Sequence, residues 1–298
     1  MRPTPYPDDA VRATPAEGLA GLLRGVRYEV LPTPSAEDRV LGSVPPDVPV
    51  TVTASPAKGL GPTLDLAVRL AGHGYRVVPH LPARQVVDEA HLAEVVARLR
   101  SAGVDDVFVP AGDADPPVGR YDAALPLLRR LTELGSPFAR VGITGYPEPH
   151  PRIDDDITVQ AMWDKQCYSS YIVSNLCFDA RALSAWIGRV RRRGVALPLR
   201  IGIAGPVQRA KLLSMASKIG VGESARFLTR HPAWFLRFAT PGGYAPERLL
   251  RAGAAALTAP EARVEGLHVF TFNQIAETER WRRALLERLG DGASPRRG

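Results

Sequence analysis

Strand-like and helix-like segments alternate along almost the whole chain, and this alternation restricts the fold more than any other feature of the sequence. Short runs rich in valine, isoleucine, tyrosine and phenylalanine predict strands at Val26–Leu31, Val48–Thr53, Tyr75–Pro79, Asp106–Pro110, Ala139–Thr144, Tyr171–Asn175, Pro198–Ile203 and Gly266–Thr271. Helical periodicity predicts helices at Thr63–Ala71, Asp88–Ala102, Tyr121–Leu134, Ala180–Arg193, Val207–Ile219, Pro246–Ala255 and Ile275–Leu289. Strands that alternate with helices form βα units, and such units build a parallel sheet that is covered on both faces.

The number of predicted strands favours a closed barrel. Eight such strands in 298 residues fit a single-domain (β/α)₈ TIM barrel of the α/β class. An open doubly wound sheet is the alternative, but no GxGxxG motif follows the first predicted strand, which weakens a dinucleotide-binding interpretation. We therefore expect a barrel domain over residues 23–290, a disordered or loosely packed leader over 1–22 and a disordered tail over 291–298.

Apolar content and the chain's first residues indicate the expected compartment. The hydrophobic content of 45% supplies the core of one large domain or two small ones. No apolar run approaches the ~20 residues that cross a bilayer, and Met1–Asp9 lacks the apolar region of a signal peptide. The cytoplasm is therefore the expected location, without a membrane partner. Cys167 and Cys177 have no paired spacing, so the sequence indicates neither a disulfide framework nor a structural zinc site.

The net charge of +7 raises the question of a nucleic-acid partner, but the distribution of charge argues against one. Only four of the 38 basic residues are lysines, and the arginines are scattered over predicted helix faces, where solvated positions explain them. The sequence contains no basic stripe with interleaved aromatic residues, the pattern that stacks bases. A positive field favours anionic small-molecule substrates and cofactors instead.

Polar side chains lie at the ends of several predicted strands, where a barrel gathers its active site. Glu29 lies within the first strand, and an acid in an otherwise apolar strand is costly to bury unless it points into the barrel mouth or finds a partner. Thr53 ends the second strand, His80 follows the third, Asp113 follows the fourth and Asn175 ends the sixth. We expect these side chains to gather on one face of the barrel.

The loop after the fifth strand, Tyr146–Pro151, is the most distinctive local motif. Its three prolines fix φ and remove backbone donors, so the segment forms a loop, excluded from helix and central strand. The loop presents Tyr146, Glu148 and His150, which can stack on a ring, accept hydrogen bonds and bind an anion. These abilities suit a cofactor pocket.

Each of these residues also has an ordinary structural interpretation. Asp113 can cap a turn, His80 can be a satisfied core histidine, and Asn175 can close a strand. Asp154–Asp156 resembles a metal cluster but is better explained as the acidic start of a helix at Ile157, where acids complement the dipole. No Ser-His-Asp elbow, P-loop or HExxH motif is present in the sequence, so hydrolase and kinase interpretations lose their usual support.

The order of these motifs resembles the methylenetetrahydrofolate reductase family from about Val26 to Leu289. The segments that carry the resemblance are Tyr-Glu-Val-Leu-Pro, Val-Thr-Val-Thr, Val-Pro-His-Leu, Ala-Gly-Asp, Gly-Tyr-Pro-Glu-Pro-His-Pro, Ser-Asn-Leu-Cys-Phe-Asp and His-Val-Phe-Thr-Phe-Asn. The resemblance implies a (β/α)₈ barrel in which FAD carries hydride from NADH or NADPH to 5,10-methylenetetrahydrofolate. The product is 5-methyltetrahydrofolate, and the reaction is reversible.

The resemblance also implies roles for individual residues. By position, Glu29 matches the family's general acid, and Asp113 matches the acidic residue near flavin and folate. The positions that match the FAD site are Thr53, His80, Gly112, Asp113, Tyr146, His150 and Lys165. Asn175 sits where the family has a pterin-binding glutamine, so Glu29, Asp113 and Asn175 are the expected folate-binding residues. The choice between NADH and NADPH, and a homo-oligomeric state, stay open.

The chain departs from the family pattern at positions that bear on the flavin. Ala111 replaces the arginine of the family's Arg-Gly-Asp, and Ala54-Ser55 replaces its Tyr-Gly. A bidentate arginine contact is not easily replaced. Two alternatives therefore remain, a flavin-independent reductase that transfers hydride directly from NADH, and a non-catalytic barrel that binds folate or flavin.

Overall fold

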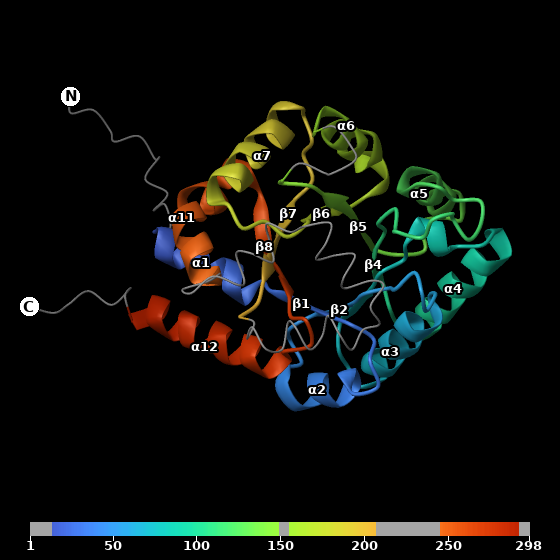
Figure 1. Ribbon diagram of the computed structural model, residues 1–298, viewed down its shortest axis with the longest axis horizontal. Coiled ribbons are helices and arrows are strands. Elements are labelled where there is room, and N and C mark those ends of the chain that lie inside the picture. The colour runs from blue at the N-terminus through green and yellow to red at the C-terminus, as the bar shows by residue number, and fades with distance from the viewer. Residues whose placement is uncertain (1–13, 149–154, 207–244, 292–298) are drawn as a thin grey trace, which may run out of the picture.

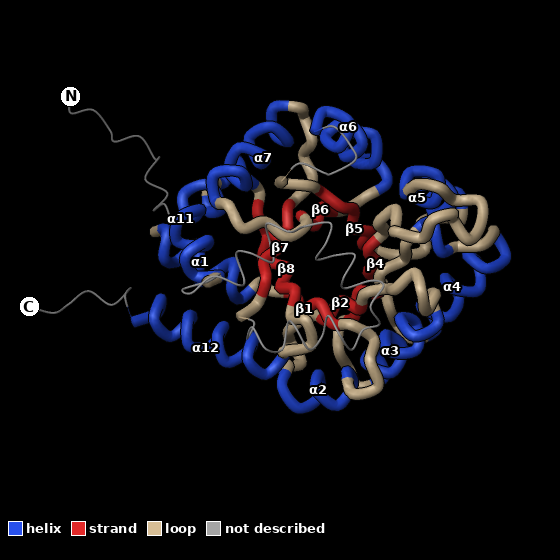
Figure 2. Tube along the Cα trace, viewed as in Figure 1, coloured by secondary structure: helices blue, strands red, loops and turns tan. Residues whose placement is uncertain are grey.

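A ring of parallel strands lies at the centre of the molecule and helices surround it (Figure 1, Figure 2). The computed structural model describes residues 14–148, 155–206 and 245–291. The strands are β1 (Arg27–Val30), β2 (Val50–Val52), β3 (Val77–Pro79), β4 (Asp106–Phe108), β5 (Arg140–Gly145), β6 (Tyr171–Ser174), β7 (Leu199–Ala204) and β8 (Val264–Phe270). They form one eight-stranded sheet in the order β3-β2-β1-β8-β7-β6-β5-β4.

The two ends of this order, β3 and β4, meet and close the barrel. A parallel bridge pairs His80 with Phe108, and the backbone N–H of Leu81 donates to the carbonyl of Phe108 at 2.8 Å. The (β/α)₈ prediction is therefore confirmed, and each of the eight predicted strands coincides with an observed one to within a few residues.

The described helices cover the outside of the barrel. They are α1 (Pro15–Arg24), α2 (Ala36–Ser43), α3 (Gly61–Gly72), α4 (Glu89–Ser101), α5 (Ala124–Glu133), α6 (Asp155–Lys165), α7 (Ala180–Arg192), α11 (Pro246–Thr258) and α12 (Ile275–Asp291). Six of the predicted helices match α3, α4, α5, α7, α11 and α12, whereas the helix predicted at Val207–Ile219 lies outside the described residues. Among the described helices, none combines the length and apolar character needed to cross a membrane.

The amino-terminal prediction is wrong for residues 15–22, which form most of α1 and are not a loose leader. Thr14 caps this helix by accepting a hydrogen bond from the N–H of Glu17, whose carboxylate in turn accepts from the N–H of Thr14. One apolar face of α1, including Leu19 and Leu23, is buried, and the helix contacts α11, α12 and β8. Residues 1–13 and the tail beyond residue 291 lie outside the description.

Alternation along each strand divides the side chains between two environments. Successive side chains of a strand point to opposite faces. In β1, Tyr28 points outward and donates a hydrogen bond to Glu279 of α12 at 2.6 Å, whereas Arg27 points inward to Asp106 of β4 at 2.7 Å. Glu29, two residues beyond Arg27, therefore also points into the barrel. Strand β1 thus directs two charged or ionisable side chains, Arg27 and Glu29, into the barrel.

Candidate active site

The barrel brings Glu29 together with two histidines from distant parts of the chain. The Nε2 atom of His268 on β8 lies 2.9 Å from Glu29 Oε2, and the Nε2 atom of His80, just after β3, lies 3.5 Å from the same oxygen. The side chains of Glu29 and His80 keep 14% and 13% of their exposure, whereas that of His268 keeps 2%. Glu29 and His80 therefore border the barrel mouth, and His268 lies beneath them.

Burial changes the protonation of all three groups. It raises the pKa of Glu29 to about 7, an effect that the neighbouring His80 partly offsets. It lowers the pKa of His80 to about 4, an effect that the charge of Glu29 partly offsets. Burial also lowers the pKa of His268 to about 3, and the positive charges of Arg27 and Arg200 lower it further. At neutral pH both imidazoles are therefore uncharged, and Glu29 holds its proton for about half of the time.

A carboxyl group that titrates near neutral pH, next to a solvent-facing mouth, is suited to general acid and base chemistry. The proton of such a group is available without a strongly acidic medium, and the resulting carboxylate can take it back. Within the described ranges, no group of three or more histidine, cysteine, aspartate or glutamate side chains is placed to hold a metal ion.

The end of β8 holds the backbone of β1 next to Glu29. Thr271 Oγ1 donates to the carbonyl of Glu29 at 2.6 Å, and the amide of Asn273 accepts from the N–H of Leu31 at 2.8 Å and donates to its carbonyl at 3.0 Å. Phe272 and Asn273 adopt positive φ values of 49° and 57°, an unfavourable conformation for a phenylalanine. The Thr-Phe-Asn part of the motif therefore positions the strand that carries Glu29.

Asp113 and Tyr146 lie near each other on neighbouring loops. Asp113 is exposed on the loop after β4, and Tyr146 follows β5 and is half-buried. Burial raises the pKa of the Tyr146 phenol, and the negative charge of Asp113 raises it further. Gly112 has a φ of +90°, and a Cβ at this position would lie 2.7 Å from the Cβ of Pro82, so only glycine fits this turn without strain.

Lys165 and Asn175 are both half-buried. Burial lowers the pKa of the Lys165 ammonium group, at the end of α6, to about 8, and the charge of Asp164 partly offsets this effect. The side-chain oxygen of Asn175 accepts from the N–H of Leu176 at 2.8 Å, a local bond that matches the ordinary interpretation of a strand-end residue. The carbonyl of Thr53 accepts from Thr63 Oγ1 at 2.7 Å, which ties the end of β2 to α3.

The distinctive loop is described only in part. His150 lies outside the described residues. Glu148 Oε1 accepts a hydrogen bond from the N–H of Phe178 at 3.1 Å, so this side chain joins the loop after β5 to the segment after β6.

Two further polar groups inside the barrel lack partners in the described part of the chain. Thr51 on β2 and Thr144 on β5 each have a buried hydroxyl oxygen without a hydrogen bond to a described residue, as do Nε2 of His80 and Nδ1 of His268. In register, Thr51 lies opposite Glu29. The hydroxyl of Thr51 therefore belongs to the same inner face of the barrel as the Glu29 carboxyl.

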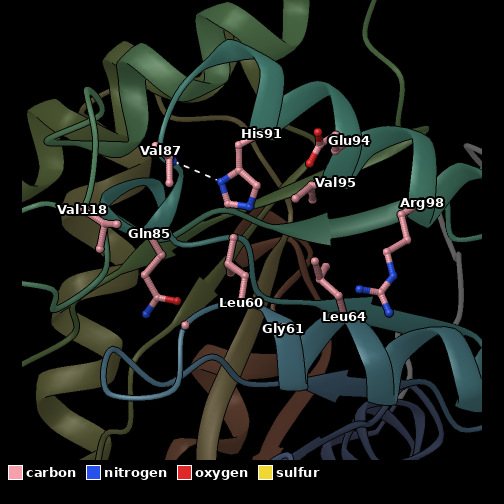
Figure 3. A pocket seen from close by; sticks show the side chains of 11 residues that line it. Leu60, Gly61, Leu64, Gln85, Val87, His91, Glu94, Val95, Arg98 and Val118 are labelled. Carbon is pink, nitrogen blue, oxygen red and sulfur yellow. Dashed lines mark hydrogen bonds between the residues drawn. The ribbon is translucent and has the colours of Figure 1, made fainter.

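A pocket of about 380 Å³ lies elsewhere, outside the barrel wall between α3 and α4 (Figure 3). Leu60, Leu64 and Val95 provide apolar lining, and His91 accepts a hydrogen bond from the N–H of Val87 at 3.1 Å. The residues that line this pocket include none of the predicted site residues. The pocket is therefore separate from the Glu29 cluster.

The sequence did not single out His268 as a site residue. It appeared only within the His-Val-Phe-Thr-Phe-Asn motif, although it lies on the same face of β8 as Phe270, which is in register with Glu29. The signal that could have identified His268 is its position as a polar residue at an inward position of a barrel strand. This signal points to Glu29 only when the register of β1 against β8 is known.

The chain is similar in fold to several solved proteins, at low identity. Dihydropteroate synthase from Thermus thermophilus, solved in complex with 6HMPPP, has a TM-score of 0.45 and 16% identity over 89% of this chain and 92% of that one. A protein from Burkholderia cenocepacia, provisionally described as a lyase/mutase, has a TM-score of 0.49 and 16% identity over 95% and 92%. Oxaloacetate acetylhydrolase has a TM-score of 0.46 and 13% identity over 80% and 94%. No protein-family profile matches the chain. Likenesses at this level carry no conclusion about what the chain binds or does.

Proposed function

We propose that the protein is an enzyme that transfers hydride between NADH or NADPH and 5,10-methylenetetrahydrofolate, with 5-methyltetrahydrofolate as the other folate. The observation that carries this proposal is Glu29, a carboxyl group in the barrel mouth whose pKa is raised by burial to about 7. It occupies the position that the family resemblance assigns to the general acid. Both substrates are anionic, in keeping with the net charge of +7.

Glu29 would supply the proton of the reaction. Protonation of a nitrogen in the folate's five-membered ring breaks its bond to the bridging methylene carbon and leaves a cationic iminium. That carbon then accepts the hydride and becomes the methyl group, so one proton and one hydride are consumed. In the reverse direction the Glu29 carboxylate takes the proton back. Asp113, on the loop after β4, would favour the cationic iminium through its negative charge.

The resemblance implies FAD and assigns Lys165, at the end of α6, to its anionic diphosphate. Burial lowers the pKa of this lysine to about 8, so its ammonium ion lacks part of its hydration and gains from a nearby anion. Lys165, Tyr146, Thr53 and Gly112 would hold the cofactor. Bound FAD would supply a carrier that takes hydride from the nicotinamide and passes it to the folate.

Direct transfer of hydride from NADH to the folate is the second candidate, and Ala111 favours it. The family's arginine is absent at this position. The nearby Arg84 is committed to the loop itself, because its guanidinium donates to the carbonyl of Ala114 at 2.6 Å and pairs with Asp115 at 3.2 Å. The loop after β4 therefore offers a flavin less positive charge than the family pattern does.

The role of Glu29 is tested with Glu29→Gln, which keeps the shape of the side chain and removes its proton donor. Turnover of methylenetetrahydrofolate is expected to fall by about 10²- to 10⁴-fold, while folate binding measured by calorimetry is retained. Glu133→Gln on the exposed face of α5 is the matched control and keeps full turnover. Unchanged turnover in Glu29→Gln would remove Glu29 from the mechanism.

The two candidates are separated by the visible spectrum of the purified protein, recorded before and after adding NADH without oxygen. A flavin band that bleaches with NADH supports FAD as the carrier, and Lys165→Met is then expected to weaken FAD binding. A colourless protein that gains no band on titration with FAD, yet oxidises NADH when methylenetetrahydrofolate is added, supports direct transfer.

A further inference from the structure

A network of charged side chains fills the barrel beneath the Glu29 cluster. Arg27 on β1 donates to Asp106 on β4 at 2.7 Å and to the hydroxyl of Tyr171 on β6 at 2.8 Å. Tyr171 donates to the other oxygen of Asp106 at 2.7 Å. All three residues are buried, and burial raises the pKa of the Tyr171 phenol far above its usual range. This phenol is therefore a neutral member of the network.

Two further arginines join the network from β5 and β7. Arg140 and Arg200 both contact Oε1 of Glu265, at 2.8 Å and 2.9 Å, and Arg200 also donates to the carbonyl of Gly25 at 2.8 Å. Three guanidinium groups therefore face two carboxylates, those of Asp106 and Glu265. We call these five charged residues, together with Tyr171, the barrel floor, and it carries an excess positive charge.

The floor lies beside and below His268. Arg27 is the register partner of His268 across the β1–β8 pairing, and Arg200 is the partner of Gly266, which precedes His268 by one inward position on β8. Layers of apolar side chains are the usual filling of such a barrel, and a buried ion-pair network is weak evidence for stability. Fold stability alone therefore gives no reason for the two buried arginines, Arg27 and Arg200.

A buried glutamate and histidine 2.9 Å apart can share one proton in two ways. Either the imidazole carries it, giving an ion pair, or the carboxyl keeps it, giving a neutral pair. Positive charge beneath the imidazole disfavours the ion pair because like charges repel strongly where water is excluded. The groups that face this pair are His80 on the β3 side, Asp106, Arg140, Tyr171, Arg200 and Glu265 in the floor, and Arg27 on β1 itself.

We propose that Arg200, together with Arg27, acts as a positioning residue that keeps His268 uncharged, so that this imidazole stays a neutral hydrogen-bond partner of Glu29. The catalytic use of the Glu29 proton rests on the proposed function. The electrostatic effect itself does not, because it can be measured without substrate.

The test follows the imidazole ¹⁵N signals of protein labelled with [¹⁵N]histidine while pH is varied from about 2 to about 8, a range that includes both the lowered pKa of His268, about 3, and the usual histidine range. The signals of His268 are identified by their loss in His268→Gln. Arg200→Met removes the charge and keeps the length of the chain, and Arg200→Lys is the matched control that keeps the charge. Arg200→Gln repeats the test with a polar neutral side chain if the methionine variant does not fold.

In the wild-type protein and in Arg200→Lys, His268 is expected to stay neutral down to about pH 3. In the neutral variants its midpoint is expected to rise by about one pH unit, equivalent to a tenfold change in proton affinity. Identical His268 titrations in the wild type and the neutral variants would overturn the inference. If the wild-type protein does not turn over methylenetetrahydrofolate while Arg200→Met still shifts His268, the reductase proposal fails and the effect of the floor stands.

Discussion

Burial decides what a single residue, Glu29, can do. Its carboxyl group has a pKa near 4.5 in water and about 7 in the folded protein, because the barrel interior penalises its charged form. The same penalty acts in the opposite direction on His80 and His268, whose cationic forms are disfavoured. One glutamate and two histidines thus share a site in which the neutral forms are favoured.

This environment makes a prediction about stability and pH. The folded protein holds the Glu29 proton up to about pH 7, whereas the unfolded chain releases it near pH 4.5. The stability contributed by this proton is present below pH 4.5 and is lost as pH rises through 7. Glu29→Gln has no such proton to lose. The free energy of unfolding of this variant minus that of the wild type is therefore expected to rise by about 2 to 3 kcal/mol when pH is raised from about 5 to about 8.

The measurement is the free energy of unfolding in urea for both proteins at the two pH values. Glu133→Gln, exposed on α5, provides the control and is expected to follow the wild type at both. A difference between Glu29→Gln and the wild type that stays constant with pH would contradict the assigned environment of Glu29.

At the scale of elements, α1 and α2 differ in how their first turns are satisfied. Thr14 caps α1 with its side chain, and Glu17 returns the bond. Ser35, at the corresponding position before α2, makes no side-chain capping bond. An unsatisfied first turn leaves backbone donors without partners, so the two residues contribute differently although both are small hydroxyl residues.

Thr14→Ala is therefore expected to cost about 1 kcal/mol of stability, because α1 packs on α11, α12 and β8 and its fraying exposes Leu19 and Leu23. Ser35→Ala is the matched control and is expected to change stability by less than about 0.5 kcal/mol. Urea unfolding of the two variants beside the wild type checks this, and equal losses in both would refute the assigned cap.

At the scale of the whole molecule, the barrel has room for Tyr171 in its floor because the facing residue on the next strand, Gly142, has no side chain. Gly142 on β5 is in register with Tyr171 on β6, and a Cβ on Gly142 would lie 2.4 Å from the tyrosine ring. Tyr171 cannot move freely, since it is bonded to both Arg27 and Asp106. The position of Gly142 on β5 must therefore stay free of a side chain, because Tyr171 is held in place by residues of β1 and β4.

Gly142→Ala is expected to destabilise the protein by about 3 kcal/mol through overpacking, and the near-ultraviolet circular dichroism of Tyr171 is expected to change with it. Gly72→Ala at the end of α3, where a Cβ meets nothing within 4 Å, is the control and is expected to leave stability nearly unchanged. Thermal unfolding measures both. A Gly142→Ala variant with the wild-type melting temperature would show that the floor is less tightly packed than described.

The amino-acid sequence determined the strands, most of the helices and therefore the class of fold. Hydrophobic period and strand-end polar residues are local properties, so Glu29, His80 and Asp113 could be selected without coordinates. The capping pair Thr14 and Glu17 is also a local signal. Helix α1 was missed because its stability depends on packing against α11 and α12, which the local sequence does not show.

The tertiary structure alone decided which residues meet. Glu29 and His268 are 239 positions apart, and Arg27 and Tyr171 are 144 apart, and nothing in the pattern of either segment names the other. Strand register places these residues together. Only the closed barrel removes the water that would otherwise keep Glu29 ionised and allow His80 and His268 to be protonated. The chemistry of the site is for this reason a property of the assembled barrel, because the pKa of each group is set by burial and by neighbours from other strands.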